Sequence, residues 1–235
     1  MGHIFTRTLL GCALGATFST AWAQAPSLLM TYSFDSLKGK FGQVQETKAK
    51  SYTLGATLVG ESYRASLFVP YISLEGPGTV INGTVTPGGG AATRRAKGLG
   101  DMVATYTRDV IGGLQTKGFA ASATGLAKLA TGDEREGLGT GKTDYGLQAD
   151  LAYRFQNNFA LTAVLGRMYY GDTPTLRLQD GNYAILGFGM PVGDSLFVNF
   201  TTSERDELLL GTEKRKERAV SAVYSLSPSS ALQFG

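Results

Sequence analysis

The sequence predicts an all-β protein, an antiparallel transmembrane β-barrel of about 12 strands when complete. Three observations predict this fold class. Apolar and polar residues alternate along many short segments, which is typical of β-strands that face two different environments. The connections between these segments are alternately short and long, as in outer-membrane barrels. No segment after the N-terminus has about 18 consecutive apolar residues, so no transmembrane helix is expected.

Five alternating segments make up the N-terminal half of the expected sheet. Successive side chains of a strand point to opposite faces, so residues i, i+2 and i+4 share a face. In each segment one face is apolar. In chain order these faces are Leu28, Met30, Tyr32 and Phe34 in 28–35; Tyr52, Leu54, Ala56 and Leu58 in 51–59; Tyr63, Ala65, Leu67, Val69 and Tyr71 in 63–73; Met102, Ala104 and Tyr106 in 99–108; and Phe119, Ala121, Ala123, Ala127 and Leu129 in 119–129.

The C-terminal half begins with the segment that alternates most clearly, 145–155. Its apolar face carries aromatic residues at both ends, as expected for a strand of ~9–11 residues that crosses a bilayer. This face is Tyr145, Leu147, Ala149, Leu151, Tyr153 and Phe155, opposite Gly146, Gln148, Asp150, Ala152 and Arg154. Further strands are expected over 159–170, 182–192, 196–202 and 219–226, and another begins at 231.

The connections fall into two length classes. The short ones are 60–62, 111–113, 156–158, 193–195 and 227–230, and the long ones are about 36–46, 75–97, 131–144, 171–181 and 203–217. Bacterial barrels have an even number of strands, whereas this chain supplies ten and begins an eleventh at Ala231. We therefore expect a chain truncated in strand 11 and an intact barrel of about twelve strands. A ten-stranded barrel with an extra segment is the alternative.

Residues 1–23 have the three parts of a secretory signal peptide: Arg7, the apolar stretch 9–18, and the small-residue site at Ala21 and Ala23. The barrel domain is then expected over 24–235, in the outer membrane of a Gram-negative bacterium. Cleavage removes the only histidine, His3, and the only cysteine, Cys12. Chemistry based on these side chains is therefore excluded, and neither an enzyme nor a cofactor is expected. The net charge of +3 does not indicate nucleic acid as a partner.

The charged residues within strands are the candidate site. A charge on the lipid face costs ~2–4 kcal/mol at the membrane midplane, so we expect strand charges to face the lumen. Two interpretations are compatible: a salt-bridge lattice that fills a narrow barrel, and a constriction that selects solutes by charge. Twelve strands lie between filled barrels of ~8 and open ones of ~16–18, so a narrow pore or solute pocket is expected. The candidate pore-lining or ligand residues are Arg64, Asp101, Lys128, Gln148, Asp150 and Arg154.

Several short motifs resemble a known family. They are Gly98-Leu-Gly-Asp101 with Tyr106 after it, Lys128-Leu-Ala-Thr-Gly-Asp133, Gly139-Thr-Gly-Lys-Thr-Asp144, Leu147-Gln-Ala-Asp-Leu-Ala-Tyr153, Leu165-Gly166-Arg167 and Tyr170-Gly171-Asp172, with Ala130 where the family usually has proline. Together they resemble the outer-membrane proteins named for the MetA pathway of phenol degradation, often labelled transporters. The resemblance covers roughly 28–235.

That resemblance implies an outer-membrane channel or uptake protein for small organic solutes, aromatic or otherwise hydrophobic. Outer-membrane lipid and lipopolysaccharide are the expected surroundings, and a closed barrel needs no partner, so a monomer is expected. The dense charges of 204–218 have two interpretations, a solvated loop or a contact with lipopolysaccharide phosphates. The alternative function is a non-transporting structural or adhesive barrel that acts through its extracellular loops.

Overall fold

The computed structural model describes residues 26–40, 44–81, 84–86, 94–113, 116–171, 178–208, 214–227 and 230–235. The expected signal peptide, 1–23, lies outside these residues. Within the described part of the chain, no helix has the length and apolar character of a membrane span.

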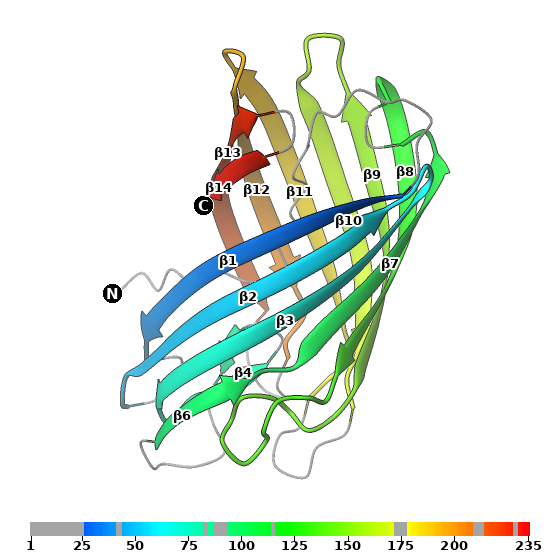
Figure 1. The fold of residues 1–235 in the computed structure, drawn as a ribbon. Helices are drawn as coiled ribbons and strands as arrows, with labels where there is room; N and C mark the ends of the chain where they lie inside the picture. Colours follow the sequence, from blue (N-terminus) through cyan, green and yellow to red (C-terminus); the bar gives the residue numbers. More distant parts are fainter. Residues whose placement is uncertain are drawn as a thin grey trace.

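The fold is all-β and is dominated by one antiparallel sheet of 12 strands (Figure 1). Its order follows the chain, β1-β2-β3-β7-β8-β9-β10-β11-β12-β13-β14, and β6 pairs with β3 beside β7. The N-terminal strands are β1 (Ser27–Gly39), β2 (Thr47–Val59), β3 (Tyr63–Gly76), β6 (Arg94–Leu99), β7 (Met102–Ile111) and β8 (Gly118–Leu129). The C-terminal strands are β9 (Asp144–Arg154), β10 (Ala160–Tyr169), β11 (Gly181–Val192), β12 (Leu196–Arg205), β13 (Arg215–Ser227) and β14 (Ser230–Phe234). A separate hairpin joins β4 (Thr79–Ile81) to β5 (Thr84–Thr86).

Each segment expected to be a strand is one, but several strands extend further toward the long loops. β1 continues to Gly39, and β12 continues to Arg205 instead of ending near 202. β13 begins at Arg215, so the charges of 204–218 lie largely on strands and not in a loop. Backbone hydrogen bonds between neighbouring strands continue in these segments although the outward side chains become polar. A prediction based on apolar alternation therefore places the strand ends too early. The hairpin β4–β5 and strand β6 were also missed, within the expected loop 75–97.

β6 and β7 continue one another along the edge of β3. Leu99 pairs with Tyr71, and Val103 pairs with Phe68, on either side of a break at Gly100 and Asp101. The Gly100 N–H donates to the carbonyl of Pro70 at 2.9 Å. A Cβ at Gly100 would lie 2.4 Å from Ile72 Cδ1, so a larger residue there would require the Ile72 side chain to move. At this break Asp101 is not paired with any residue of β3.

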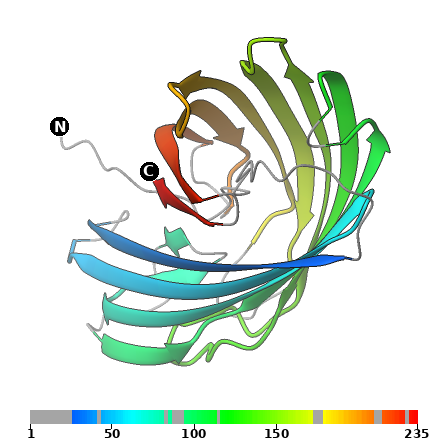
Figure 2. The same ribbon diagram turned by 45° about the horizontal axis from the view of Figure 1, so that its top comes forward.

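The sheet curls strongly around a central axis, but it does not close (Figure 2). β1 and β14 are its two edge strands, and neither pairs with the other among the described residues. The closed barrel expected from the sequence is therefore not seen in this structure. β14 spans only five residues, so it presents a short edge to any neighbour.

The two faces of the sheet are the reverse of those of a water-soluble sandwich. The outer face exposes large apolar side chains, among them Tyr32 at 69 % and Leu147 at 64 %. The inner face buries polar ones, including Lys128 at 0 % and Gln148 at 8 %. The alternation expected for 145–155 is confirmed, because Tyr145 and Leu147 are exposed whereas Gly146 and Gln148 are buried. This distribution of apolar and polar side chains is typical of a β-barrel with an apolar exterior and a polar interior.

Large side chains of the inner face lie along the sheet instead of projecting from it. An added Cβ at Gly166 would lie 2.3 Å from the ring of Tyr183, and one at Gly189 would lie 2.6 Å from the ring of Phe197. Gly55 lies equally close under Phe68, at 2.8 Å. Glycine on one strand thus makes room for a ring from another.

The hairpin β4–β5 covers the inner face near the long loops. Val80 and Val85 are buried there with side chains from four strands and one loop. This apolar cluster comprises Leu37, Ala49, Ile72, Leu74, Val80, Val85, Ala96 and Leu138. The N–H of Val80 also donates to the carbonyl of Gly137 at 3.0 Å, which ties the hairpin to loop 130–143. The hairpin therefore folds inward and narrows this end of the sheet's interior.

Candidate functional site: a polar row on the inner wall

One transverse row of paired residues crosses the inner face and carries a connected set of polar groups. Cross-strand pairing places each member directly opposite the next. Neighbours at this spacing have Cβ atoms ~4.5–5.5 Å apart, close enough for direct hydrogen bonds. The row comprises Arg64, Thr107, Thr124, Gln148, Gly166, Tyr183, Arg205 and Arg215, from β3 to β13.

A chain of hydrogen bonds follows this row from β7 to β11. The hydroxyls of Thr107 and Thr124 lie 2.8 Å apart, and Thr124 Oγ1 donates to Asp150 Oδ2 at 2.8 Å. Gln148 Nε2 donates to the other carboxylate oxygen, Asp150 Oδ1, at 2.6 Å. Tyr183 Oη then donates to Gln148 Oε1 at 2.6 Å. These bonds fix the orientation of the amide and the carboxylate, because each donor and acceptor already has a defined partner.

Tyr183 reaches Gln148 across an intervening strand. The two residues belong to β11 and β9, and β10 lies between them. Gly166 is the member of the row on β10, and its lack of a side chain lets the tyrosine ring pass over the backbone. On its other side the ring lies under the guanidinium of Arg205, with Cζ 5.9 Å from the ring centroid. Stacking on a ring suits the planar guanidinium.

The charges of the row are partly balanced. Arg64 Nη1 lies 3.1 Å from Asp109 Oδ1, and both side chains are largely buried. Arg64 is also close enough to Asp150 for electrostatic attraction. At the other end Arg215 is bonded to Glu217. The inner wall therefore presents cations and anions side by side.

A second buried cluster surrounds Lys128, four residues along β8 from Thr124. Its Nζ lies 2.9 Å from Asp101 Oδ2 and 3.0 Å from Asp144 Oδ2, and it also contacts Thr140 Oγ1. The Lys128 and Asp144 side chains are 1 % and 0 % exposed. A buried cation with two anions and a hydroxyl has its donors satisfied, so this cluster is a fastening and not an open binding site.

The cluster holds loop 130–143 against the wall. Asp101 accepts hydrogen bonds from the N–H groups of Gly132 at 2.9 Å and Thr140 at 3.1 Å. An added Cβ at Gly139 would lie 2.3 Å from the Asp101 carboxylate. Asp144 accepts a bond from the N–H of Gly171 at 3.0 Å, which extends the fastening to the next loop. Three of the motifs noted in the sequence, 98–101, 128–133 and 139–144, thus meet at one place.

The six expected residues do not form one site. Gln148 and Asp150 are bonded to each other, and Arg64 lies near them. Asp101 and Lys128 belong instead to the separate fastening. The remaining residue, Arg154, is half-buried on the same face at the far end of β9. The pattern along one strand placed these side chains on the inner face, but it carried no information about their partners.

Several residues of these clusters were not predicted. Thr124, Tyr183 and Arg205 belong to the row, Asp109 is the ion-pair partner of Arg64, and Asp144 completes the fastening. Asp109 could have been predicted from the sequence. It directly follows the expected strand 99–108, and continuing the alternation by one residue places its side chain on the inner face. Thr124 and Tyr183 had none, because an uncharged polar residue on a strand is too common to single out.

The expectation that strand charges face inward was wrong for several residues. Arg108 and Arg167 lie on the outer face beside apolar neighbours. Both lie within three residues of a strand end. In transmembrane barrels an outward charge near the ends of a strand costs only ~0–1 kcal/mol. Arg167 is also held by Asn182 at 3.4 Å and lies over the ring of Tyr169.

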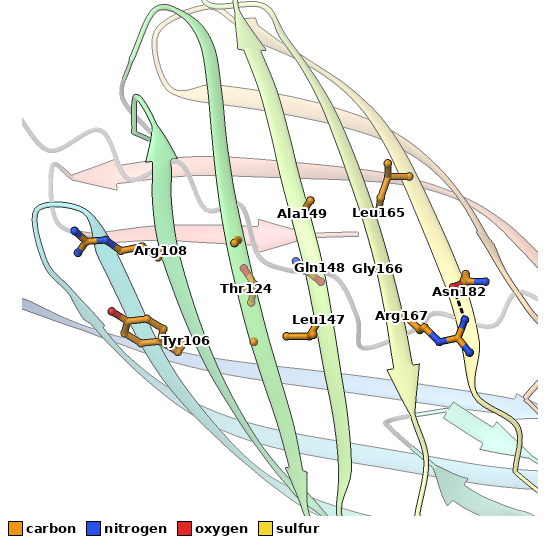
Figure 3. Close-up of a pocket in the computed structure, with 12 residues that line it drawn as sticks. Tyr106, Arg108, Thr124, Leu147, Gln148, Ala149, Leu165, Gly166, Arg167 and Asn182 are labelled. Atoms are coloured by element: carbon orange, nitrogen blue, oxygen red, sulfur yellow. Dashed lines mark hydrogen bonds between the residues drawn. The ribbon is translucent and has the colours of Figure 1, made fainter.

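A shallow depression of about 670 Å³ lies on the outer face between these two arginines (Figure 3). Its floor is made of the small residues Ala123, Gly125 and Ala149. Gln148 and Thr124 contribute to its lining although their hydrogen bonds lie on the inner side of the wall. The depression therefore backs onto the polar row and is not continuous with it.

Comparison with known proteins adds no relative to this description. No protein-family model matches the chain, and no curated protein matches it.

Proposed function

We propose that the chain forms an outer-membrane β-barrel through which small organic solutes pass passively. The observation that carries the proposal is the pair of opposite faces, with exposed Tyr32 and Leu147 outside and buried Gln148 and Lys128 inside. In the proposed protein the sheet closes as a barrel of about twelve strands after export by the signal peptide. It acts as a monomer, and solutes follow their gradient without a catalytic step.

The polar row supplies the proposed selectivity. Solutes that pass along the inner wall meet the Asp150 carboxylate, the Gln148 amide and the Arg205 guanidinium, all held by neighbours. The ring of Tyr183 lies flat against the wall beside them and adds an apolar surface. This mixture suits small molecules with an aromatic body and a polar group, and the MetA-pathway resemblance supports the same solute class.

Single-channel conductance in a planar bilayer tests the proposal. We expect discrete openings, and we expect Asp150→Asn to shift the ion selectivity toward anions because it removes an inner negative charge. Asp194→Asn, which removes an exposed charge in the turn after β11, is the control and should shift selectivity much less. Silence from a demonstrably folded protein would overturn the channel. Liposomes that take up a labelled phenol no faster than empty ones would overturn the solute class.

A second function is favoured by the inward hairpin β4–β5. If the hairpin blocks the interior, the barrel is structural or adhesive and acts through its loops. Val85→Asp distinguishes the two, because a charge in this buried apolar cluster should expel the hairpin. A channel that is only narrowed becomes more conductive, whereas a blocked barrel changes from silent to open.

A further inference from the structure

The outer face of β1, β2, β3 and β6 is built in three parallel rows near the long loops. The first row is aromatic and apolar: Phe34 pairs with Tyr52, Tyr52 with Tyr71, and Tyr71 with Leu99. All four side chains are exposed, and the rings of Phe34 and Tyr52 lie 5.0 Å apart. Aromatic rows of this kind occur where a barrel wall meets the lipid head groups.

The next two rows toward the long loops are basic. In one row Lys50 and Lys97 flank Ser73, with Ser36 at the end. In the following row Lys38 pairs with Lys48, Lys48 with Glu75, and Glu75 with Arg95. We call this set of outward cations the basic patch: Lys38, Lys48, Lys50, Arg95 and Lys97. Its strands lie at the lower left of Figure 1.

Only part of this patch is neutralised by the protein. Arg95 lies 3.0 Å from Glu75, and Lys38 lies 3.6 Å from Glu46. Among the described residues no carboxylate lies within 4 Å of Lys48, Lys50 or Lys97. Like charges placed directly opposite on neighbouring strands, such as Lys38 and Lys48, are destabilising. An anion outside the protein would relieve this repulsion.

The position of the basic patch along the membrane normal indicates which kind of anion it would meet. Residues two apart on a strand are separated by ~6–7 Å, and barrel strands tilt by ~35–45°. Lys50 therefore lies ~5 Å beyond the aromatic row along the membrane normal, and Lys48 about twice as far. The polar head-group layer occupies a similar depth, ~5–8 Å on each side of the hydrocarbon core. Phosphates of membrane lipids lie in this layer.

A second basic cluster provides an internal contrast. Lys214 and Lys216 on the side of β13 also face outward, but Lys214 lies 3.0 Å from Asp206 and Lys216 lies 3.3 Å from Glu204. Their charge is balanced within the protein, so they need no external anion.

We infer that the basic patch binds the head group of an outer-leaflet lipid that carries more than one phosphate. This inference rests on the proposed membrane location, not on the proposed passage of solutes. The three cations without a carboxylate partner among the described residues, Lys48, Lys50 and Lys97, exceed the charge of one phosphate, and the aromatic row below packs against the acyl chains of the same lipid.

Native mass spectrometry of the full chain in phosphatidylcholine nanodiscs tests the inference. The probes are diphosphoryl lipid A, monophosphoryl lipid A and inorganic pyrophosphate. We expect the diphosphoryl lipid to bind most tightly, because it offers two phosphates to the cations. Each cation near an anionic lipid surface adds a comparable share of the binding free energy. The double variant Lys48→Gln, Lys50→Gln should bind it about 10- to 30-fold more weakly. The control Lys214→Gln, Lys216→Gln removes the same charge and should weaken binding less than about threefold.

Equal loss in both double variants would overturn the location of the site. Equal binding of the two lipids would overturn the preference for more than one phosphate, and competition by pyrophosphate at the lipid's own concentration would overturn a lipid ligand. A conducting barrel without lipid preference would defeat this inference alone. A chain that does not enter bilayers would defeat the proposed function and this inference together.

Discussion

Replacing Gly166 by alanine perturbs the point where Tyr183 crosses β10. The added Cβ would lie 2.3 Å from Tyr183 Cζ and 2.4 Å from its Oη. Ordinary carbon contacts begin near ~3.5 Å, so the ring must move by roughly 1 Å or more. The ring then loses its 2.6 Å hydrogen bond to Gln148. Overpacking costs ~1–3 kcal/mol and a lost hydrogen bond ~0.5–1.5 kcal/mol. Removing a strand glycine offsets ~0.5–1 kcal/mol, so we expect a net loss of ~1–3 kcal/mol.

Urea unfolding of the folded protein in vesicles, followed by far-UV circular dichroism, measures this loss. Gly125→Ala is the matched control, since Gly125 also lies within a strand but an added Cβ meets nothing within 4 Å. We expect the control to leave the free energy of unfolding unchanged or to raise it by up to ~1 kcal/mol.

A double-mutant cycle separates the contact from general effects on the strand. In a Tyr183→Ala background the obstacle is gone, so Gly166→Ala should cost little, and the coupling should reach ~1–2 kcal/mol. Equal costs for Gly166→Ala and Gly125→Ala, or additive costs of Gly166→Ala and Tyr183→Ala, would refute the reasoning.

Two further predictions concern charges. Lys128→Met leaves the buried carboxylates of Asp101 and Asp144 without their cation, so it should lower the free energy of unfolding by ~3–5 kcal/mol. Lys142→Met, at an exposed lysine, should have little effect on the same free energy. Similar values for the two variants would contradict a role of Lys128 in fastening the loop. The backbone N–H of Asn182 and then the ammonium of Lys214 hold the pKa of Asp206 below its usual value. Its stabilising contribution is therefore present above the unfolded pKa of ~3.9 and is lost as the pH falls through the lower folded pKa. Asp206→Asn should accordingly lower the melting temperature at pH ~6 and match the parent protein at pH ~2, and a difference that persists at the lower pH would speak against this linkage.

The placement of strands was predictable because it depends on local periodicity. Tyr145 to Arg154 alternates so regularly that a single strand defines both faces. Strand ends were less predictable, since Lys48 and Lys50 interrupt the apolar pattern although the ladder of β2 continues through them. A rule based on the cost of charge in lipid placed Asp150 correctly and Arg108 wrongly, because that cost depends on depth along the strand.

The candidate site was less predictable because it depends on register. Thr124, Gln148 and Tyr183 lie far apart in the sequence and meet because three strands align at one level. A one-residue shift of any strand would turn its side chain to the other face. The register depends in turn on loops such as 130–143, which are fastened by Lys128.

The sequence by itself therefore determined the all-β class, the order of the strands in the sheet and the polarity of its two faces. These features follow from alternation within single strands and from the lengths of the connections between them. Only the tertiary structure decided that Lys128 joins Asp101 to Asp144, that β4–β5 folds inward, that the sheet stays open between β1 and β14, and that Tyr183 crosses Gly166 to reach Gln148. Each of these contacts joins residues from different strands or loops, and their meeting depends on the combined register of the whole sheet.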